Sequence, residues 1–296
     1  MINRILDFSE APARLRVRVA QLIVQRADRP EVSVPLADLA VVLVAHPQVT
    51  FTQAVLAGLA VAGGVFVTCN GQNLPVGMLL PLAAHTTQAE RFAAQARAPA
   101  PMRKRLWQQI VRAKIAAQAA LLTELRGVDF GVGALAGRVH SGDPSNVEAR
   151  AARQYWPHLF ADLAFRRHRE NEDQNILLNY GYAVLRAIVA RAICAAGLHP
   201  SLGLHHHNRY NAFCLADDLM EPYRPTVDRA VAEYMSTHDE PYRLEAAAKQ
   251  HLIGELTGRY EVSGEQRTLF DTAARMASSL ADVFLGNAEE LELPEW

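Results

Sequence analysis

The sequence predicts an α+β fold, with a small β-rich N-terminal domain, residues 1–85, followed by a larger all-helical domain, residues 86–296. Arginine alternates with Leu or Val over residues 14–19, which is the period-2 pattern of a strand with one wet face. Residues 40–44 form an unbroken apolar run of strand length. From about Gln88 onward, apolar residues recur at helical spacing instead. The chain therefore changes from strand patterns to helix patterns near residue 85.

Short elements fill the β-rich domain. Thr50 or Thr52 can cap a helix that runs to about Ala62, where a Gly63-Gly64 pair ends it. Asn70-Gly71 is a turn signal. Further strands are expected over residues 32–34, 65–67 and 78–80.

Helical patterns dominate the larger domain. Helices are expected over residues 103–125, from Ser145 onward, and over 177–196, 212–220, 226–236, 242–256 and 265–286. Segment 177–196 is apolar on most sides, which predicts a central buried helix. A chain of 296 residues exceeds one typical domain, so we expect two cores of unequal size. The acidic segment 289–296 is interpreted as a docking tail.

The composition says more about the cellular compartment of the protein than about its binding partners. A formal net charge of −1 gives no general argument for nucleic acid, although a local basic face is compatible with it. The three cysteines lie far apart and form no CxxC pair, which argues against a disulfide framework or a zinc site. No signal peptide is evident, and glycines interrupt the apolar stretch 54–67 before it could span a bilayer. We therefore expect a cytoplasmic protein without a membrane partner.

Two carboxylates and an imidazole form the candidate site: Glu148, His206 and Glu221. Such a set can hold a divalent metal ion and leave coordination positions open. Mixed oxygen and nitrogen ligation suits Mn²⁺ and tolerates Mg²⁺. Because a hard cation stabilises charge on phosphate oxygens, the set indicates phosphodiester chemistry.

Each of these residues also has a structural interpretation. Ser145-x-x-Glu148 fits a capping box, in which the glutamate satisfies a backbone donor at the helix start. The run His205-His206-His207 is also typical of a solvated turn. The acids between Asp217 and Glu221 have helical spacing and can form a solvated face. Their apolar neighbours favour a partly buried pocket, where carboxylates need a metal or a cation.

Basic clusters give limited support for a polyanionic partner. One predicted helix carries Arg103-Lys104-Arg105, Arg112 and Lys114, and a second cluster is Arg166-Arg167-His168-Arg169. Arg209 and Arg224 flank the His and Glu motifs. Basic groups beside aromatic residues fit a surface that follows phosphates and stacks bases. Solvated helix faces explain any single cluster at least as well.

Four ordered blocks carry a family resemblance. They are Asn146-Val147-Glu148-Ala149-Arg150-Ala151-Ala152-Arg153, Leu178-Asn179-Tyr180-Gly181-Tyr182, Gly203-Leu204-His205-His206-His207-Asn208-Arg209-Tyr210, and Leu215-Ala216-Asp217-Asp218-Leu219-Met220-Glu221-Pro222-Tyr223-Arg224-Pro225. In order and spacing these blocks resemble the CRISPR-associated integrase family, the universal spacer-acquisition integrase, and its type II branch in particular. They cover about residues 145–228, and the β-rich start and helical remainder are similar to the family layout over the whole chain.

The resemblance implies that Glu148, His206 and Glu221 are the catalytic residues and the metal ligands. The family's histidine precedes its second acid by fifteen positions, which selects His206 over its two neighbours. Asp218 matches a recurring acid that supports the ligands or joins them. Residues implied to position DNA or to surround the site are Asn179, Tyr180, Arg209, Arg166 and Arg167.

The reaction implied by the resemblance is a transesterification. A 3′-hydroxyl of a short duplex, the prespacer, attacks a phosphodiester of a repeat array, with Mg²⁺ or Mn²⁺ as cofactor. The implied partners are double-stranded DNA, a second copy of the chain bound through the β-rich domain, a small ferredoxin-like companion in a heterohexamer, and the effector nuclease of a type II locus, all in a prokaryotic cytoplasm. Two alternatives remain at this point, a metal-dependent structure-specific endonuclease that uses water, and a non-catalytic DNA-binding scaffold.

Overall fold

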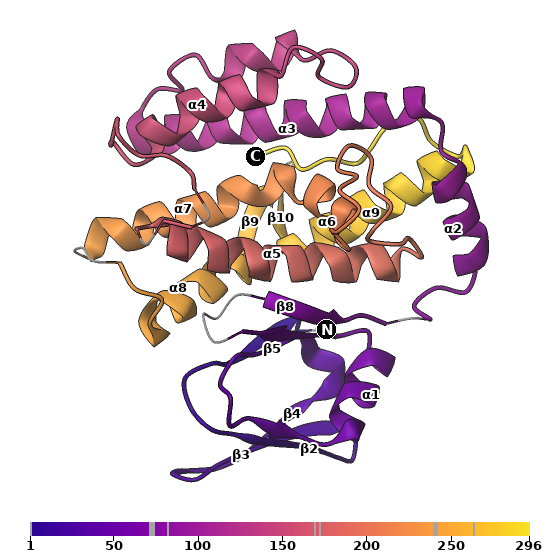
Figure 1. Cartoon of the computed structure of the whole chain (residues 1–296), viewed down its shortest axis with the longest axis vertical. Coiled ribbons are helices and arrows are strands. Elements are labelled where there is room, and N and C mark those ends of the chain that lie inside the picture. Colours follow the sequence, from indigo (N-terminus) through magenta and orange to yellow (C-terminus); the bar gives the residue numbers. More distant parts are fainter. Residues whose placement is uncertain are drawn as a thin grey trace.

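A β-rich N-terminal region and a helical C-terminal region make up the mixed α+β fold in a computed structural model (Figure 1). The structure describes residues 2–70, 75–81, 83–168, 170–171, 173–238, 242–262 and 264–296. Gly71 of the predicted turn and Arg169 of the second basic cluster lie outside these residues. Strands give way to helices between Leu79, where β8 ends, and Gln88, where α2 begins.

Two four-stranded sheets build the β-rich region. One sheet has the order β1 (Arg4–Phe8), β5 (Leu39–Val44), β7 (Val65–Cys69), β8 (Pro75–Leu79), and the other has the order β4 (Arg29–Pro35), β3 (Gln21–Arg26), β2 (Arg14–Arg18), β6 (Thr50–Phe51). The first three strands of the first sheet run parallel, and β8 is antiparallel to β7. Helix α1 (Gln53–Val61) and the 3₁₀ helix η1 (Leu36–Asp38) connect strands.

The apolar run in β5 has a physical explanation, because both faces of its sheet are covered. Val41 and Leu43 belong to the large core that continues into the helical region, while Val42 and Val44 belong to a smaller core between the two sheets. Side chains alternate along a strand, so a strand buried on both faces must be apolar at every position. The prediction of two unequal cores is confirmed, and the larger one includes strand residues.

Helices form most of the second region. They are α2 (Gln88–Arg97), α3 (Ala100–Arg126), η2 (Gly133–Arg138), α4 (Val147–Leu159), α5 (Asn175–Ala195), α6 (Cys214–Leu219), η3 (Glu221–Tyr223), α7 (Arg224–Thr237), α8 (Ala246–Leu256) and α9 (Leu269–Leu285). Figure 1 shows α5 crossing the middle of this region, between the β-rich region and the layer of α3 and α4. Among the helices of the described chain, α5 alone has the length and hydropathy to cross a membrane, and 78% of that window is buried inside the protein, as in a core helix.

The second region is not all-helical, which corrects the prediction. Strands β9 (Arg259–Val262) and β10 (Glu265–Thr268) pair antiparallel, and α9 begins only at Leu269. The predicted helix over residues 265–286 therefore has a strand as its first four residues. Glu265, Gln266 and Arg267 carry no apolar period, so nothing in their pattern signals a strand.

Polar contacts join the two regions. The Tyr180 hydroxyl on α5 donates to Asp7 on β1. Arg191 Nε, also on α5, donates to the Gly63 carbonyl at 2.7 Å. Lys249 Nζ on α8 lies 2.5 Å from a carboxylate oxygen of Glu10. These contacts hold α5 and α8 against the β-rich region.

Candidate active site

Glu148 lies in the first turn of α4, and its side chain does not cap that helix. Asp143 does so instead, because its carboxylate accepts from the backbone N–H of Val147 at 2.9 Å and of Glu148 at 3.0 Å. The capping-box interpretation of Glu148 is therefore wrong. The glutamate side chain is free to reach across to α3.

Glu221 sits in a sharp break between α6 and α7. The 3₁₀ turn η3 begins at Glu221, and Pro222 and Pro225 occupy the first turns of η3 and α7, where a missing N–H costs no helical hydrogen bond. This break points the Glu221 side chain inward, where it is 4% exposed. The acid at the end of the predicted cluster is therefore buried, unlike a solvated helix face.

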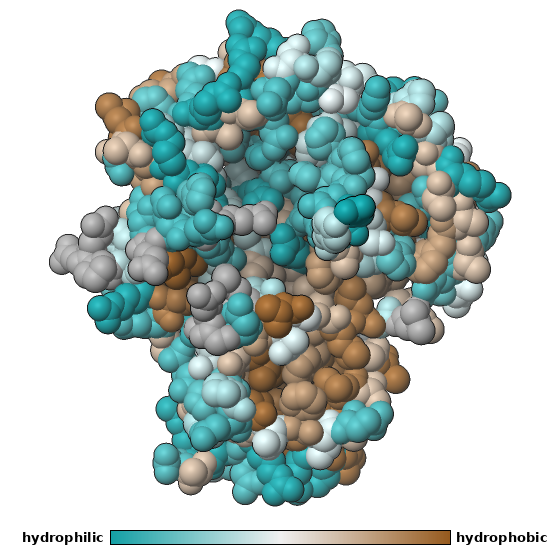
Figure 2. All heavy atoms as spheres, in the orientation of Figure 1, coloured by the Kyte–Doolittle hydropathy of each residue, from teal (hydrophilic) through white to brown (hydrophobic). Residues whose placement is uncertain are grey.

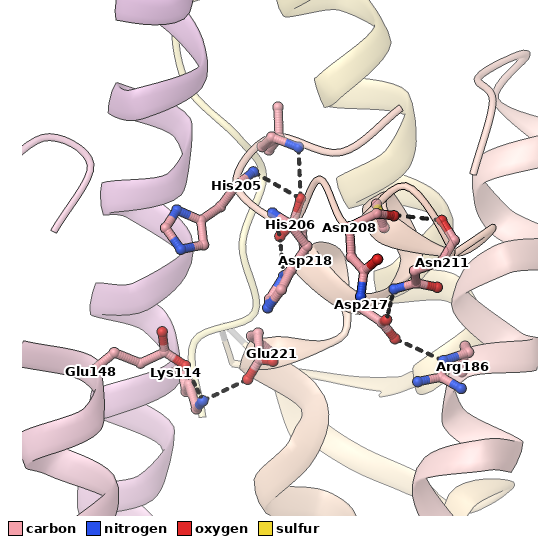
Figure 3. A network of polar contacts seen from close by, with 12 residues as sticks. Lys114, Glu148, Arg186, His205, His206, Asn208, Asn211, Asp217, Asp218 and Glu221 are labelled. Atoms are coloured by element: carbon pink, nitrogen blue, oxygen red, sulfur yellow. Dashed lines mark hydrogen bonds and ion pairs between the residues drawn. The ribbon is translucent and has the colours of Figure 1, made fainter. Parts of the chain in front are cut away.

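Lys114 on α3 lies between the two glutamates (Figure 3). Its Nζ is 2.6 Å from Oε1 of Glu148 and 2.6 Å from Oε2 of Glu221. The other oxygen of Glu221 lies 2.9 Å from Nε of Arg224. Lys114 was predicted to belong to a basic face that meets a polyanion; the structure corrects this, because the lysine is buried inside the acidic centre.

Opposing effects set the charge state of this group. Burial by itself raises the pKa of Glu221, but the positive charges of Arg224 and Lys114 outweigh it and hold that pKa well below its usual value. Burial by itself lowers the pKa of Lys114, and the charges of Glu221 and Glu148 reverse this to a raised pKa. The centre is thus an ionised, mutually compensated cluster.

His206 is held by Asp218, which is fully buried on α6. Oδ1 of Asp218 lies 2.6 Å from Nδ1 of His206, and the Asp218 carboxylate also accepts from the backbone N–H groups of Leu204, His205 and His206. A carboxylate can only accept, so Nδ1 carries the proton, and Nε2 is the nitrogen with a lone pair when the ring is neutral. The hydrogen bond to Asp218 raises the pKa of His206 against the effect of burial.

The three consecutive histidines have different environments. The His206 ring lies above Glu221 in Figure 3, whereas His205 points away toward α3. His205 stacks on Trp107, with ring centroids 4.3 Å apart and planes inclined by 4°. His207 is exposed. The loop therefore places only the middle histidine toward the two glutamates.

The donor set fits a divalent cation by its chemistry, since Glu148 and Glu221 offer hard oxygens and His206 an imidazole nitrogen. A positively charged nitrogen, that of Lys114, already stands between the carboxylates. Within the described residues, no three His, Cys, Asp or Glu side chains are gathered closely enough to hold an ion as they stand. The structure thus brings Glu148 and Glu221 together around a lysine ammonium, with His206 beside them.

The other residues predicted to position DNA lie in three places, namely around a cavity, on the surface and at the junction of the two regions. Arg167 donates to Asn175 and Asn179 at 2.7 Å each, and a cavity of about 200 Å³ is lined by Arg167, Asn179, Arg186 and Arg224 among others. Arg166 and Arg209 are exposed on loops. Tyr180 is 3% exposed and bonds to Asp7, which places it at the junction of the two regions rather than at a surface.

Sequence reasoning missed two buried features. Lys114 shares a helix stripe with Ile110, Ala117 and Leu121, which are all buried, and a lysine within an apolar stripe signals a buried anionic partner. The second feature is Asp228, which accepts from the hydroxyls of Tyr155 at 2.8 Å and of Tyr182. No local pattern marks this carboxylate, because its partners lie on α4 and α5.

Fold and centre together define a class, namely two-region α+β proteins with an acidic centre assembled from distant helices of the second region. The family model for CRISPR associated protein Cas1 matches residues 8–133 and 143–241. The chain is 39% identical over 288 residues to the CRISPR-associated endonuclease Cas1 of Neisseria meningitidis serogroup C, covering 95% of this chain and 93% of that protein. The chain belongs to the Cas1 family.

Solved structures share this fold. A casposase bound to integration product superposes with a TM-score of 0.81 at 18% identity, covering 97% of this chain and 92% of that chain. The Cas6-RT-Cas1–Cas2 complex superposes with a TM-score of 0.76 at 19% identity, covering all of this chain and 36% of that one. At these identities the likeness concerns the fold.

Proposed function

We propose that this chain is a metal-dependent DNA integrase that joins short duplex DNA to a CRISPR repeat array. The observation that carries the proposal is the convergence of Glu148 and Glu221, from separate helices, on a single buried cation position beside His206. The proposal is supported by membership of the Cas1 family and by a fold shared with a casposase whose structure contains an integration product.

Glu148, Glu221 and Nε2 of His206 would hold Mg²⁺ or Mn²⁺. When bound, such an ion neutralises charge that develops on the phosphate and lowers the pKa of a hydroxyl. Asp218 keeps His206 in the tautomer that offers Nε2, and Arg224 fixes one oxygen of Glu221. These contacts hold the donors in place before DNA arrives.

The reaction exchanges one phosphodiester for another. The 3′-oxygen of the incoming strand forms a bond to the target phosphorus, the bond from that phosphorus to the target strand's own 3′-oxygen breaks, and the proton of the attacking hydroxyl ends on the released oxygen. No external energy source is needed, because the number of phosphodiesters is unchanged. Exposed basic side chains at the start of α3, Arg103 to Arg105, would face the DNA backbone.

The proposed partners follow from the family. They are double-stranded DNA, a second copy of the chain, a small ferredoxin-like companion in a heterohexamer, and the effector nuclease of a type II locus, and the work is done in a prokaryotic cytoplasm. One solved neighbour contains Cas1 together with Cas2, which supports a small companion protein. Pairing of two copies is supported by apolar surface on the β-rich region around α1 and β8 (Figure 2), where Val61, Val76 and Leu79 are exposed.

The deciding assay compares DNA substrates with free and blocked 3′ ends. We expect covalently joined product only with free 3′-hydroxyls and only when Mg²⁺ or Mn²⁺ is supplied. Cleavage without joining, insensitive to 3′ blocking, would favour the endonuclease alternative. DNA binding with neither product would favour the non-catalytic scaffold.

Variants assign the reaction to the site. Glu148→Gln, Glu221→Gln and His206→Ala are each expected to abolish joining. Glutamine is used because it keeps the side-chain volume and one acceptor oxygen beside Lys114 and Arg224, whereas truncating Glu221 would leave these buried basic groups with neither the anion nor an acceptor. His207→Ala, an exposed neighbour of His206, is the matched control and should join DNA like wild type.

A further inference from the structure

The Lys114 ammonium is a cation that lies inside the acidic centre. Its Nζ donates a hydrogen bond to Oε1 of Glu148 at 2.6 Å and lies 2.6 Å from Oε2 of Glu221. Toward Oε2 of Glu221 the ammonium therefore presents a positive charge at close range. A metal ion would relate to that oxygen in the same way.

Because the ion pair between Lys114 and Glu221 is buried, separating the two side chains costs free energy. The side chains of Lys114 and Glu221 are 11% and 5% exposed, and the remaining oxygen of Glu221 faces Arg224. Two carboxylates are thus balanced by two basic groups without any further ion. Adding a divalent cation beside an ammonium at the same oxygens would place like charges in contact in a region of low dielectric constant.

We propose that Lys114 is the resident counter-ion of the metal-free centre and competes with the divalent ion for the oxygens of Glu148 and Glu221. This inference rests on the proposed function, since it takes those glutamates as ligands. Metal loading then requires the ammonium to leave the carboxylates. A flexible four-carbon stem lets a lysine make that movement, which a guanidinium stacked on a ring, as Arg224 is on Tyr182, does not.

The competition predicts two effects of a neutral side chain. Lys114→Gln should bind Mn²⁺ at least ten times more tightly than wild type in isothermal titration calorimetry without DNA. Lys114→Gln in chelator should also melt at a lower temperature than wild type, because only Arg224, beside Glu221, then remains to balance the two carboxylates. Added Mn²⁺ should raise the melting temperature of the variant more than that of wild type.

Two control variants distinguish the effect of the charge between the two carboxylates from the effect of charge elsewhere on the protein. Lys104→Gln removes an exposed lysine from the same helix and should leave Mn²⁺ affinity at the wild-type value. Lys114→Arg keeps a positive charge between the carboxylates and should show no tightening. If Lys114→Gln does not fold in chelator, it can be purified with Mn²⁺, and its Mn²⁺ release after chelator is added should be slower than that of wild type.

The outcomes are distinguishable. Mn²⁺ affinity of Lys114→Gln equal to or weaker than wild type, or faster release, overturns the role of Lys114 and leaves the integrase proposal standing. Mn²⁺ binding that Glu148→Gln and Glu221→Gln do not weaken overturns both proposals, because the ion then binds elsewhere.

Discussion

Oδ1 of Asp218 lies 2.6 Å from Nδ1 of His206, and the same carboxylate accepts three backbone N–H groups from the loop that carries this histidine. One buried acid therefore fixes both the ring orientation of His206 and the path of its backbone.

Asp218→Asn is expected to weaken Mn²⁺ binding by about ten- to a hundredfold, because an amide offers a single acceptor oxygen and its NH₂ group opposes backbone donors. Titration calorimetry would measure the affinity. Asp217→Asn is the control, since Asp217 pairs with Arg186 and Asn211 instead of the histidine loop. Equal affinities in the two variants would contradict the role given to Asp218.

Trp296 supports the turn that carries Glu221. Its Nε1 donates to the Pro222 carbonyl at 3.1 Å, and its ring packs edge-on against Tyr223 and Tyr260. Trp296→Ala should lower the free energy of unfolding by about 2 kcal/mol and also reduce the rate of joining. Trp296→Phe should recover most of the stability. A joining rate at the wild-type level in the alanine variant would show that the turn holds its position unaided.

Asp228 should make stability fall as the pH rises. Burial raises its pKa to about 6 despite hydrogen bonds from Tyr182 and Tyr155. The folded protein therefore holds this proton more tightly than the unfolded chain, so the contribution of Asp228 to stability is fully present below about pH 4 and is lost between about pH 4 and 6. The loss amounts to about 3 kcal/mol.

Urea unfolding of wild type and Asp228→Asn across pH 4.5–7.5 measures this contribution by difference, because all other groups titrate alike in both proteins. The stability of wild type relative to the variant should decline with rising pH. A difference that is constant over the range, or that grows with pH, would refute the assignment.

Tyr180 is expected to contribute to stability rather than to DNA affinity. Tyr180→Phe removes the hydroxyl that donates to Asp7 and should cost about 1–2 kcal/mol in urea unfolding. Its affinity for a DNA duplex, measured by fluorescence anisotropy, should match that of wild type. Tyr210→Phe, at an 80% exposed site, should leave stability unchanged. A large loss of DNA affinity with unchanged stability would restore the role first predicted for Tyr180.

Periodic segments could be predicted well from the sequence. Strand β2 lies within its expected range, β5 begins one residue before its expected range and α5 two residues before its own, because alternation, a continuous apolar run and a long apolar helix are strong patterns. Strands β1 and β3 were not predicted. Each has only a few adjacent apolar residues, such as Leu22-Ile23-Val24, and these do not distinguish strand from helix.

The site could be predicted only in part. Residue types and the family resemblance pointed to Glu148, His206 and Glu221, and the acidic segment 289–296 contacts η3 of its own chain through Trp296. The basic partner of the two glutamates was missed, because the pairing of Lys114 with Glu221 joins α3 to η3 across distant stretches of sequence. Tertiary pairings of this kind leave no local signature.

The polar bonds between the β-rich region and helices α5 and α8 have a mechanical consequence. Arg191 and Lys249 fasten loops of the β-rich region to α5 and α8, and α5 packs against α6 and α7, which carry Asp218 and Arg224 of the acidic centre. A partner that binds the β-rich region therefore cannot rotate this region by itself, because the helical region rotates with it. In the proposed dimer, the angle at which the two copies join would therefore set the distance and the relative orientation of their two acidic centres on a DNA duplex.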